Sequence, residues 1–447
     1  MLEGPILRNV IAYTVPIILS GVLQLLFNAA DLVVVGQFCG SVSVAAVGAT
    51  GSIINLIVTL FIGLSVGAGV LVAQGVGAGD AESVRRTVHT AVPTAVIGGV
   101  LLTLVGLFGS GTFLRLMKTP EEVLGLSSVY MRLYFCGMTA NMLYNFGASI
   151  LRATGDTRGP LLYLSAAGVV NVILNLFFVI ALKMNVAGVG LATALSQCVS
   201  AALVLIALTR REDACRYRLR DTRIYKKELL GMLRIGVPAG IQGSLFSISN
   251  VIIQSGVNSF GAVAMSGNAA AGNIEGFVYV SMNALHQTAL NFTGQNYGAK
   301  NYGRIGKITL CCLGAVTVVG GVLGVLGRLF AKPLLGIYVP DSPEAIAYGT
   351  LRMNYICLPY FLCGIMDVMT GALRGLGASL VPMIISVAGV CGFRILWIFT
   401  VFARPETHTL QILYLSYAIS WILTFLAESA VYLILVKRIR RQEEVYG

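Results

Sequence analysis

The chain has 447 residues, of which 56% are hydrophobic and only 11% are charged, and its mean hydropathy is +0.83. Soluble proteins carry about 25% charged residues, so this composition excludes a soluble globular domain and indicates an integral membrane protein. The net charge of +12 would suit a nucleic-acid-binding protein. However, the basic residues lie in short loops between apolar runs, so we expect no nucleic-acid partner. The nine cysteines are scattered without metal-ligand spacing, and we expect neither a metal site nor a cofactor.

Twelve apolar segments follow one another along the chain. Barrel strands need only about 9–11 residues and alternate polar with apolar side chains, so segments of this length favour helices. The sequence therefore predicts an all-α membrane protein with 12 transmembrane helices. Their approximate cores are residues 10–36, 44–78, 88–112, 128–151, 160–182, 187–209, 232–258, 264–293, 307–330, 346–372, 380–402 and 411–436.

The distribution of Lys and Arg predicts the orientation. Most of the 31 basic residues fall on one side if both termini are cytoplasmic. The stretch Arg210–Arg234 is the one substantial polar linker, and it divides the segments six and six. We therefore predict an N-terminal lobe at 1–209, a cytoplasmic linker at 210–231, a C-terminal lobe at 232–437 and a cytoplasmic tail at 438–447, in a multi-pass protein of the cell membrane.

The two halves resemble each other at a common offset of 222 residues, the distance from Pro16 to Pro238. At this offset Arg152 matches Arg374, and several glycines, leucines and an asparagine also match. Because six is an even number, the second half enters the membrane in the same sense as the first. The predicted lobes are then related by a pseudo-two-fold axis along the membrane normal. The two prolines either bend their helices or occupy a first helical turn.

Asp31 is a carboxylate within the first apolar segment, and neither its own segment nor the next contains a basic residue. A charge at membrane depth costs at least about 2.5–3.5 kcal/mol, so such residues are rare and usually functional. At offset 222 the second half has Ile253 at this position, which makes the aspartate specific to the first half. A carboxylate in a low-dielectric site can exchange a proton near neutral pH or bind Na⁺.

Several polar residues are candidates to complete this site. Asn171 and Asn175 are spaced i, i+4 and project from one helix face, and Asn28 lies three residues before Asp31. Thr193 adds a hydroxyl in the sixth segment, and Gln197 follows it by one turn. The alternative for each of these groups is that it forms hydrogen bonds between packed helices.

Three further acids lie within apolar segments, namely Glu275, Asp367 and Glu428. Each is a candidate for function, or else an acid paired with a basic residue. Arg394 is a candidate partner of Glu428. Asp367 replaces Asn145 of the first half and precedes the sequence GALRG, and Glu275 lies in a polar patch with two asparagines.

The chain is similar to the multidrug and toxic compound extrusion (MATE) family over essentially its whole length. The resemblance rests on VP followed by FNAADLVVVGQF, on QGVGAG and QNYGAK, on LRATGDTRGP and GALRGLG, and on AGVGLATALSQ. It implies two six-helix lobes around a central cavity and export of amphipathic, often cationic, compounds in exchange for H⁺ or Na⁺. It implies no enzymatic activity. We further expect a monomer that contacts only its small-molecule substrates and membrane lipid.

The resemblance also implies site residues. The cation site of the first lobe corresponds to Asp31, Asn28, Asn171, Asn175 and Thr193, although relatives with two carboxylates have an acid where this chain has Asn175. Asp367, Glu275 and Gln197 are implied at a substrate site or second cation site. The alternative within the superfamily is a flippase for lipid-linked oligosaccharides, and alternatives of other classes are an intramembrane enzyme and a channel.

Overall fold

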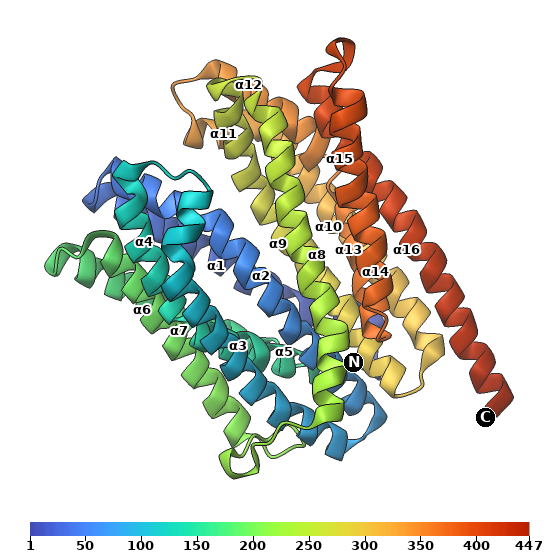
Figure 1. Ribbon diagram of the computed structural model, residues 1–447. Helices are drawn as coiled ribbons and strands as arrows, with labels where there is room; N and C mark the ends of the chain where they lie inside the picture. Colours follow the sequence, from blue (N-terminus) through green and yellow to red (C-terminus); the bar gives the residue numbers. More distant parts are fainter. Residues whose placement is uncertain (447) are drawn as a thin grey trace. The chain divides into compact units, whose positions relative to one another are not determined.

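The computed structural model describes residues 1–446, and within them every regular element is a helix (Figure 1). The predicted all-α class is confirmed. The first half contains α1 (Ile6–Phe38), α2 (Ser41–Ala78), α3 (Ala81–Leu116), α4 (Glu121–Cys136), α5 (Met138–Ala153), α6 (Arg158–Leu176), the π-helix η1 (Phe177–Ala181), α7 (Asn185–Arg210) and the 3₁₀-helix η2 (Leu219–Asp221).

The second half is broken more often, in part by π-helical turns. It contains α8 (Lys226–Asn258), α9 (Ala262–Gly298), α10 (Tyr302–Leu329), α11 (Ala331–Tyr338), α12 (Pro343–Arg352), η3 (Met353–Cys357), α13 (Phe361–Gly375), α14 (Leu380–Ser386), η4 (Val387–Gly392), α15 (Phe393–Trp397), η5 (Ile398–Phe402), η6 (Pro405–Thr407) and α16 (Leu410–Tyr446). Every one of the twelve predicted segments is helical, although segments 4, 5, 10 and 11 are built from several pieces.

Nine of the described helices are long and apolar enough to cross a membrane, which makes this a multi-pass membrane protein. The pair Pro343–Cys357 and Phe361–Gly375, bent by 42°, would be a tenth span. Helix α9 is long but carries many polar residues, and α4 and α5 have only 16 residues each. The number of twelve spans and the symmetry of the lobes stay predictions.

Pro16 and Pro238 lie inside continuous helices. Helix α1 begins at Ile6, ten residues before its proline, and α8 begins at Lys226. The alternative that these prolines occupy a first helical turn is therefore wrong. A proline in this position removes an intrahelical hydrogen bond, which makes a helix easier to bend.

The described chain divides into two compact units. The first unit is Leu19–Ser244, and the second unit is Met1–Ile18 together with Leu245–Gly447. Both boundaries fall within long helices, so α1 and α8 each contribute to both units. The predicted lobes rest on the repeat and the polar linker, and their boundaries stay a prediction.

In the first unit the start of α8 packs against α2 through glycines. A Cβ atom added at Gly63 would lie 2.3 Å from the backbone nitrogen of Gly240, and one added at Gly240 would lie 2.1 Å from the carbonyl oxygen of Leu60. Any side chain would push the helices apart, so the absence of side chains allows this approach. Ser244 fixes the contact further, since its hydroxyl donates to the Leu56 carbonyl at 3.2 Å.

In the second unit the start of α1 packs against α9. The hydroxyls of Thr14 and Thr288 are hydrogen-bonded at 2.8 Å, and the ring of Tyr13 meets Phe292 edge-on at 5.3 Å between centroids. Helix α9 also packs along α13 (Figure 1).

Candidate functional site

Asp31 lies on the part of α1 that belongs to the first unit, and its side chain is half-buried. Its Oδ1 accepts a hydrogen bond from Nδ2 of Asn175 on α6. One turn earlier, Phe27 packs on α6 so closely that a Cβ added at Gly168 would lie 1.8 Å from its ring. Gly168 therefore lets α1 approach α6 at the level of the aspartate.

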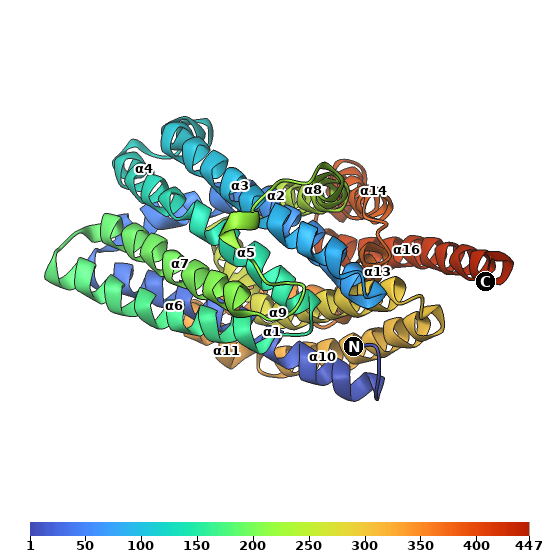
Figure 2. The same ribbon diagram turned by 90° about the horizontal axis from the view of Figure 1, so that it is seen from below.

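Two further polar residues extend this contact. Nδ2 of Asn175 also lies 3.2 Å from Oδ1 of Asn171, one turn earlier on α6. Nδ2 of Asn171 in turn lies 3.5 Å from the hydroxyl of Thr193 on α7, which runs beside α6 (Figures 1 and 2). We call Asp31, Asn175, Asn171 and Thr193 the Asp31 network. Four residues predicted from the sequence thus lie in one hydrogen-bonded chain.

The structure does not bring the remaining first-lobe candidates into this network. Asn28 is exposed. Gln197 lies one turn after Thr193, but its Oε1 faces the junction of α4 and α5, where a Cβ added at Gly137 would lie 2.4 Å away. Gln197 belongs to the first unit, whereas Asp367 and Glu275, which the sequence prediction groups with it, belong to the second.

Glu275 on α9 is buried in a bidentate ion pair with Arg352 of α12. Arg352 Nη2 lies 2.7 Å from Oε2 of Glu275 and its Nε lies 3.0 Å from Oε1. Arg352 Nη1 also donates to Asn268 at 2.7 Å, and Tyr414 donates to the same amide oxygen at 2.9 Å. These contacts satisfy the acid and favour the alternative in which it is paired with a base.

Asp367 on α13 is also buried, with 9% of its surface exposed. Its backbone carbonyl lies 2.6 Å from Nδ1 of His286, so this ring nitrogen must be the donor and carry the proton. Arg374, two turns along the same helix, interacts electrostatically with the Asp367 carboxylate.

Glu428 on α16 is completely buried. Its carboxylate is hydrogen-bonded to Thr370 and Ser386. Arg394 is not its partner, contrary to the pairing considered from the sequence. Instead, Nε of Arg394 donates to Ser420 at 3.0 Å, and its guanidinium lies 4.0 Å from the centroid of the Tyr417 ring. The sequence signal for Glu428 was its depth within an apolar segment, but its hydroxyl partners lie on other helices and were not foreseen.

The Asp31 network offers oxygen ligands of the kind that hard cations prefer. It combines one carboxylate with amide and hydroxyl oxygens. Oδ1 of Asn175 is buried, and no described residue donates a hydrogen bond to it, so its lone pairs are available to a cation. Among residues 1–446 there is no cluster of three His, Cys, Asp or Glu that would hold a metal such as zinc. The network therefore fits H⁺ or Na⁺ better than a transition metal.

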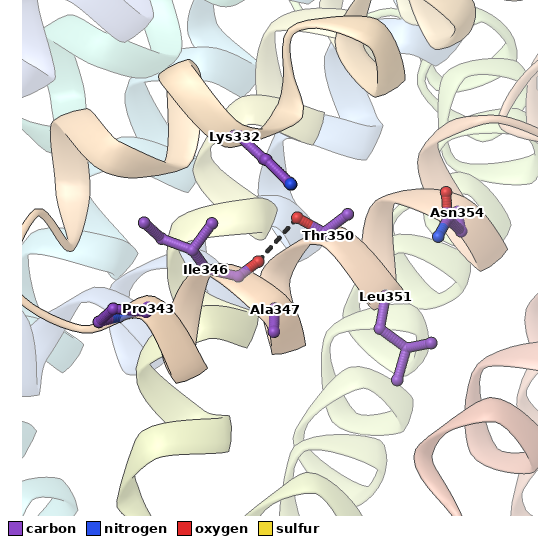
Figure 3. Close-up of a pocket in the computed structure, with 7 residues that line it drawn as sticks. All are labelled: Lys332, Pro343, Ile346, Ala347, Thr350, Leu351 and Asn354. Atoms are coloured by element: carbon purple, nitrogen blue, oxygen red, sulfur yellow. Dashed lines mark hydrogen bonds between the residues drawn. The ribbon is translucent and has the colours of Figure 1, made fainter.

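Two cavities lie away from these acids. One, of about 380 Å³, is lined by residues of α11, α12 and η3, including Lys332, Thr350 and Asn354 (Figure 3). Figure 3 shows the Thr350 hydroxyl turned back to the Ile346 carbonyl, 2.7 Å away. The other, of about 260 Å³, lies beside the end of α2 and the polar linker, near Arg211 and Cys215. Neither contains a residue predicted for the site.

The family model described as MatE matches residues 16–177 and 238–400. The chain is 27% identical to "Probable multidrug resistance protein YoeA" of Bacillus subtilis over 396 residues, covering 87% of this chain and 85% of that protein. It is also 27% identical to "Probable multidrug resistance protein NorM" of Thermotoga maritima over 400 residues, covering 87% and 84%. The solved structure "Crystal structure of MATE in complex with MaL6" has the same fold, with a TM-score of 0.91, 21% identity and 98% of both chains covered.

Proposed function

This chain belongs to the MatE family, and we propose on that basis that it is a multidrug efflux transporter that exports amphipathic, often cationic, small molecules across the cell membrane. The names of the relatives from Bacillus subtilis and Thermotoga maritima support multidrug efflux as the activity. We propose no enzymatic activity and no cofactor other than a coupling ion. The flippase alternative is not favoured, because these relatives are named as multidrug resistance proteins.

The proposed architecture is two six-helix lobes related by a pseudo-two-fold axis along the membrane normal, with both termini cytoplasmic. The two stretches matched by the family model begin at Pro16 and Pro238, the same pair that defines the repeat in the sequence. This supports a duplicated bundle with lobes at 1–209 and 232–437. Transport would then proceed by rocking of the lobes, as in other transporters built from parallel repeats.

The coupling ion, H⁺ or Na⁺, is proposed to bind at Asp31. The observation that carries this proposal is the hydrogen-bonded chain from Asp31 through Asn175 and Asn171 to Thr193. A half-buried carboxylate at the end of a hydrogen-bonded chain of three neutral polar residues can gain a proton or a cation while that chain persists. Asp367 is proposed as a second acid for the coupling ion or the substrate.

Coupling requires that the ion and the drug prefer different states of the transporter. In the proposed cycle the outward-open state takes up the ion at Asp31, and loss of the negative charge alters the contact of α1 with α6. Helix α1 contains Pro16 and contributes to both compact units, so a change of its bend is a physical route for this signal. The drug is then released outside, and the ion is released inside.

The test is ethidium efflux from membrane vesicles, driven separately by a pH gradient and by a sodium gradient. We expect Asp31→Asn to abolish efflux under both gradients while the protein is still produced and inserted. Asn28→Ala is the matched control, because Asn28 lies one turn away on α1 and is exposed. Undiminished efflux by Asp31→Asn would remove the proposed role of Asp31, and absence of ethidium efflux by the unaltered protein would remove the proposed activity for this class of substrate.

A further inference from the structure

Glu428 is an acid for which the proposed cycle has no use, and it is the most completely enclosed carboxylate among those discussed above. Its exposed fraction is 0%, and those of Thr370 and Ser386 are 1% and 0%. The Thr370 hydroxyl lies 2.9 Å from Oε1 and 3.0 Å from Oε2, and the Ser386 hydroxyl lies 2.8 Å from Oε1. Three helices, α13, α14 and α16, thus supply one residue each to a buried cluster of oxygen atoms.

The surrounding charges do not balance. Glu428 interacts electrostatically with the Asp367 carboxylate and the Arg374 guanidinium, both on α13. Arg374 therefore faces two carboxylates with a single positive charge. The other titratable groups that face Asp367 are Tyr279 and His286 of α9 and Cys363 of α13. These are neutral groups in their ordinary states, so the formal charges of Asp367, Glu428 and Arg374 sum to one negative charge when both acids are ionised.

The geometry of the cluster favours the proton. A carboxylate accepts hydrogen bonds from both hydroxyls, and a protonated carboxyl can donate to one hydroxyl and accept from the other, because a hydroxyl is both donor and acceptor. Rotation of the Thr370 or Ser386 hydroxyl is then enough to serve either state. A metal cation would need several oxygens arranged around it, whereas these oxygens are in direct hydrogen-bonding contact with one another.

Two further features single out this position. Ser386 ends α14, and the next residues form the π-helix η4, an irregularity that is frequent at functional sites. Thr424, one turn before Glu428 on α16, is 1% exposed, and no described residue forms a hydrogen bond with its hydroxyl. That hydroxyl lies against the π-helix, since a Cβ added at Gly389 would lie 2.2 Å from it.

The repeat indicates that the cluster is not part of the shared scaffold. At the offset of 222 residues Arg374 matches Arg152, but Thr370 and Ser386 match Ala148 and Leu164. The first half thus keeps the arginine and replaces both hydroxyls with apolar side chains. The two hydroxyls are therefore present only in the half that also has the buried acid beside them.

We propose that Glu428, Thr370 and Ser386 form a second proton-binding site, in which one exchangeable proton neutralises the cluster of Asp367, Glu428 and Arg374. Proton binding converts the Glu428 carboxylate to a carboxyl held by the same two hydroxyls. The contribution of this proton to transport rests on the proposed efflux function, whereas its binding does not.

Proton binding is tested by infrared difference spectroscopy of the purified protein between acid and alkaline pH. A protonated buried carboxyl gives a carbonyl stretching band separate from those of ionised carboxylates. We expect Glu428→Gln to remove one such band, and Ser386→Ala to shift it, because the carboxyl loses one hydrogen bond. Glu122→Gln, an exposed acid at the start of α4, is the matched control and should leave the band unchanged. A full set of bands in Glu428→Gln, or a band that Ser386→Ala does not move, would overturn the proposal.

A second measurement separates proton binding from coupling. We expect Glu428→Gln to exchange fewer protons per ethidium molecule exported than the unaltered protein does, because one proton site is lost while Asp31 remains. If ethidium efflux is absent in the unaltered protein, the efflux function fails and the infrared result still decides the site. If the infrared band is lost but the ratio of protons to ethidium is unchanged, the site binds a proton that is not used for coupling, and the role in transport is rejected.

Discussion

Asn175 on α6 donates a hydrogen bond to the carboxylate of Asp31 on α1. The amide nitrogen thus supplies a neutral donor to the one carboxylate of the Asp31 network. Because the same nitrogen contacts Asn171, the whole network depends on this one side chain. A substitution at Asn175 can therefore show whether the network binds a proton or Na⁺.

Replacing Asn175 with Asp should shift the ion response of transport toward sodium. Two carboxylates in direct contact repel each other, and a metal cation that binds both relieves the repulsion. We expect ethidium efflux by Asn175→Asp to become dependent on the sodium gradient. The apparent affinity of the transporter for sodium should rise about tenfold or more, which corresponds to about 1.4 kcal/mol of binding free energy. Asn28→Asp introduces the same charge at an exposed site of α1 and should not change the response. Equal behaviour of the two variants would show that the network does not select the ion.

The ion pair of Glu275 and Arg352 should govern stability more than transport. Removing one partner of a buried pair leaves an uncompensated charge and costs about 3–5 kcal/mol. We therefore expect Glu275→Gln to lower the unfolding temperature of the purified protein markedly, while the variant that remains folded still exports ethidium.

The control for this prediction is an exposed ion pair. Glu82 contacts Arg85 and Arg86 at the start of α3, with about half of its side chain exposed (49%). Glu82→Gln should leave the unfolding temperature unchanged, since exposed pairs contribute little. If folded Glu275→Gln protein no longer exports ethidium, Glu275 has a role in transport and the prediction is wrong.

The sequence predicted the helices and much of the Asp31 network because both follow from local spacing. Asn171 and Asn175 share a face by the helical repeat, and a carboxylate with no nearby base stands out in an apolar segment. Asn28 was also placed on the Asp31 face by spacing, but it is exposed. Spacing fixes which residues share a helix face and leaves open which neighbouring helix, if any, covers that face.

The polar contacts of the second unit could not be predicted in this way, because they join segments that are far apart in the sequence. Arg352 meets Glu275 across 77 residues, and Glu428 meets Thr370 across 58. Arg394, the base named as a candidate partner of Glu428, donates to Ser420 and lies over the ring of Tyr417 instead. Pairing among buried charges is decided by helix packing, which a single sequence does not specify.

The glycine contact between α2 and α8 should be sensitive to any added side chain. A Cβ atom at Gly240 would overlap the carbonyl oxygen of Leu60. We expect Gly240→Val to destabilise the protein by about 1–3 kcal/mol or more, the usual range for overpacking, seen as a lower unfolding temperature. Gly314→Val on α10 is the matched control, because nothing lies within 4 Å of the added Cβ there. A similar unfolding temperature for both variants would contradict the close approach of the two helices.

The polar linker should loosen in acid through a single aspartate. Nε of Arg211 lies 2.9 Å from both carboxylate oxygens of Asp213, and the backbone nitrogen of Cys215 donates to Oδ1 at 3.0 Å. The hydrogen bond from Arg211 holds the pKa of Asp213 below its usual value of 3.8. A pKa that is lower in the folded state stabilises this turn above pH 3.8, and that stabilisation is lost as the pH falls through the folded value.

Cys215 is the reporter for this loosening, since it is 1% exposed and burial raises the pKa of its thiol to about 12. We expect it to resist 4,4′-dithiodipyridine, a thiol reagent active in acid, at neutral pH and to react as the pH falls below 3.8, measured by peptide-resolved mass spectrometry. Asp213→Asn should react already at neutral pH and show no acid transition. An acid transition that persists in Asp213→Asn would assign the loosening to another group.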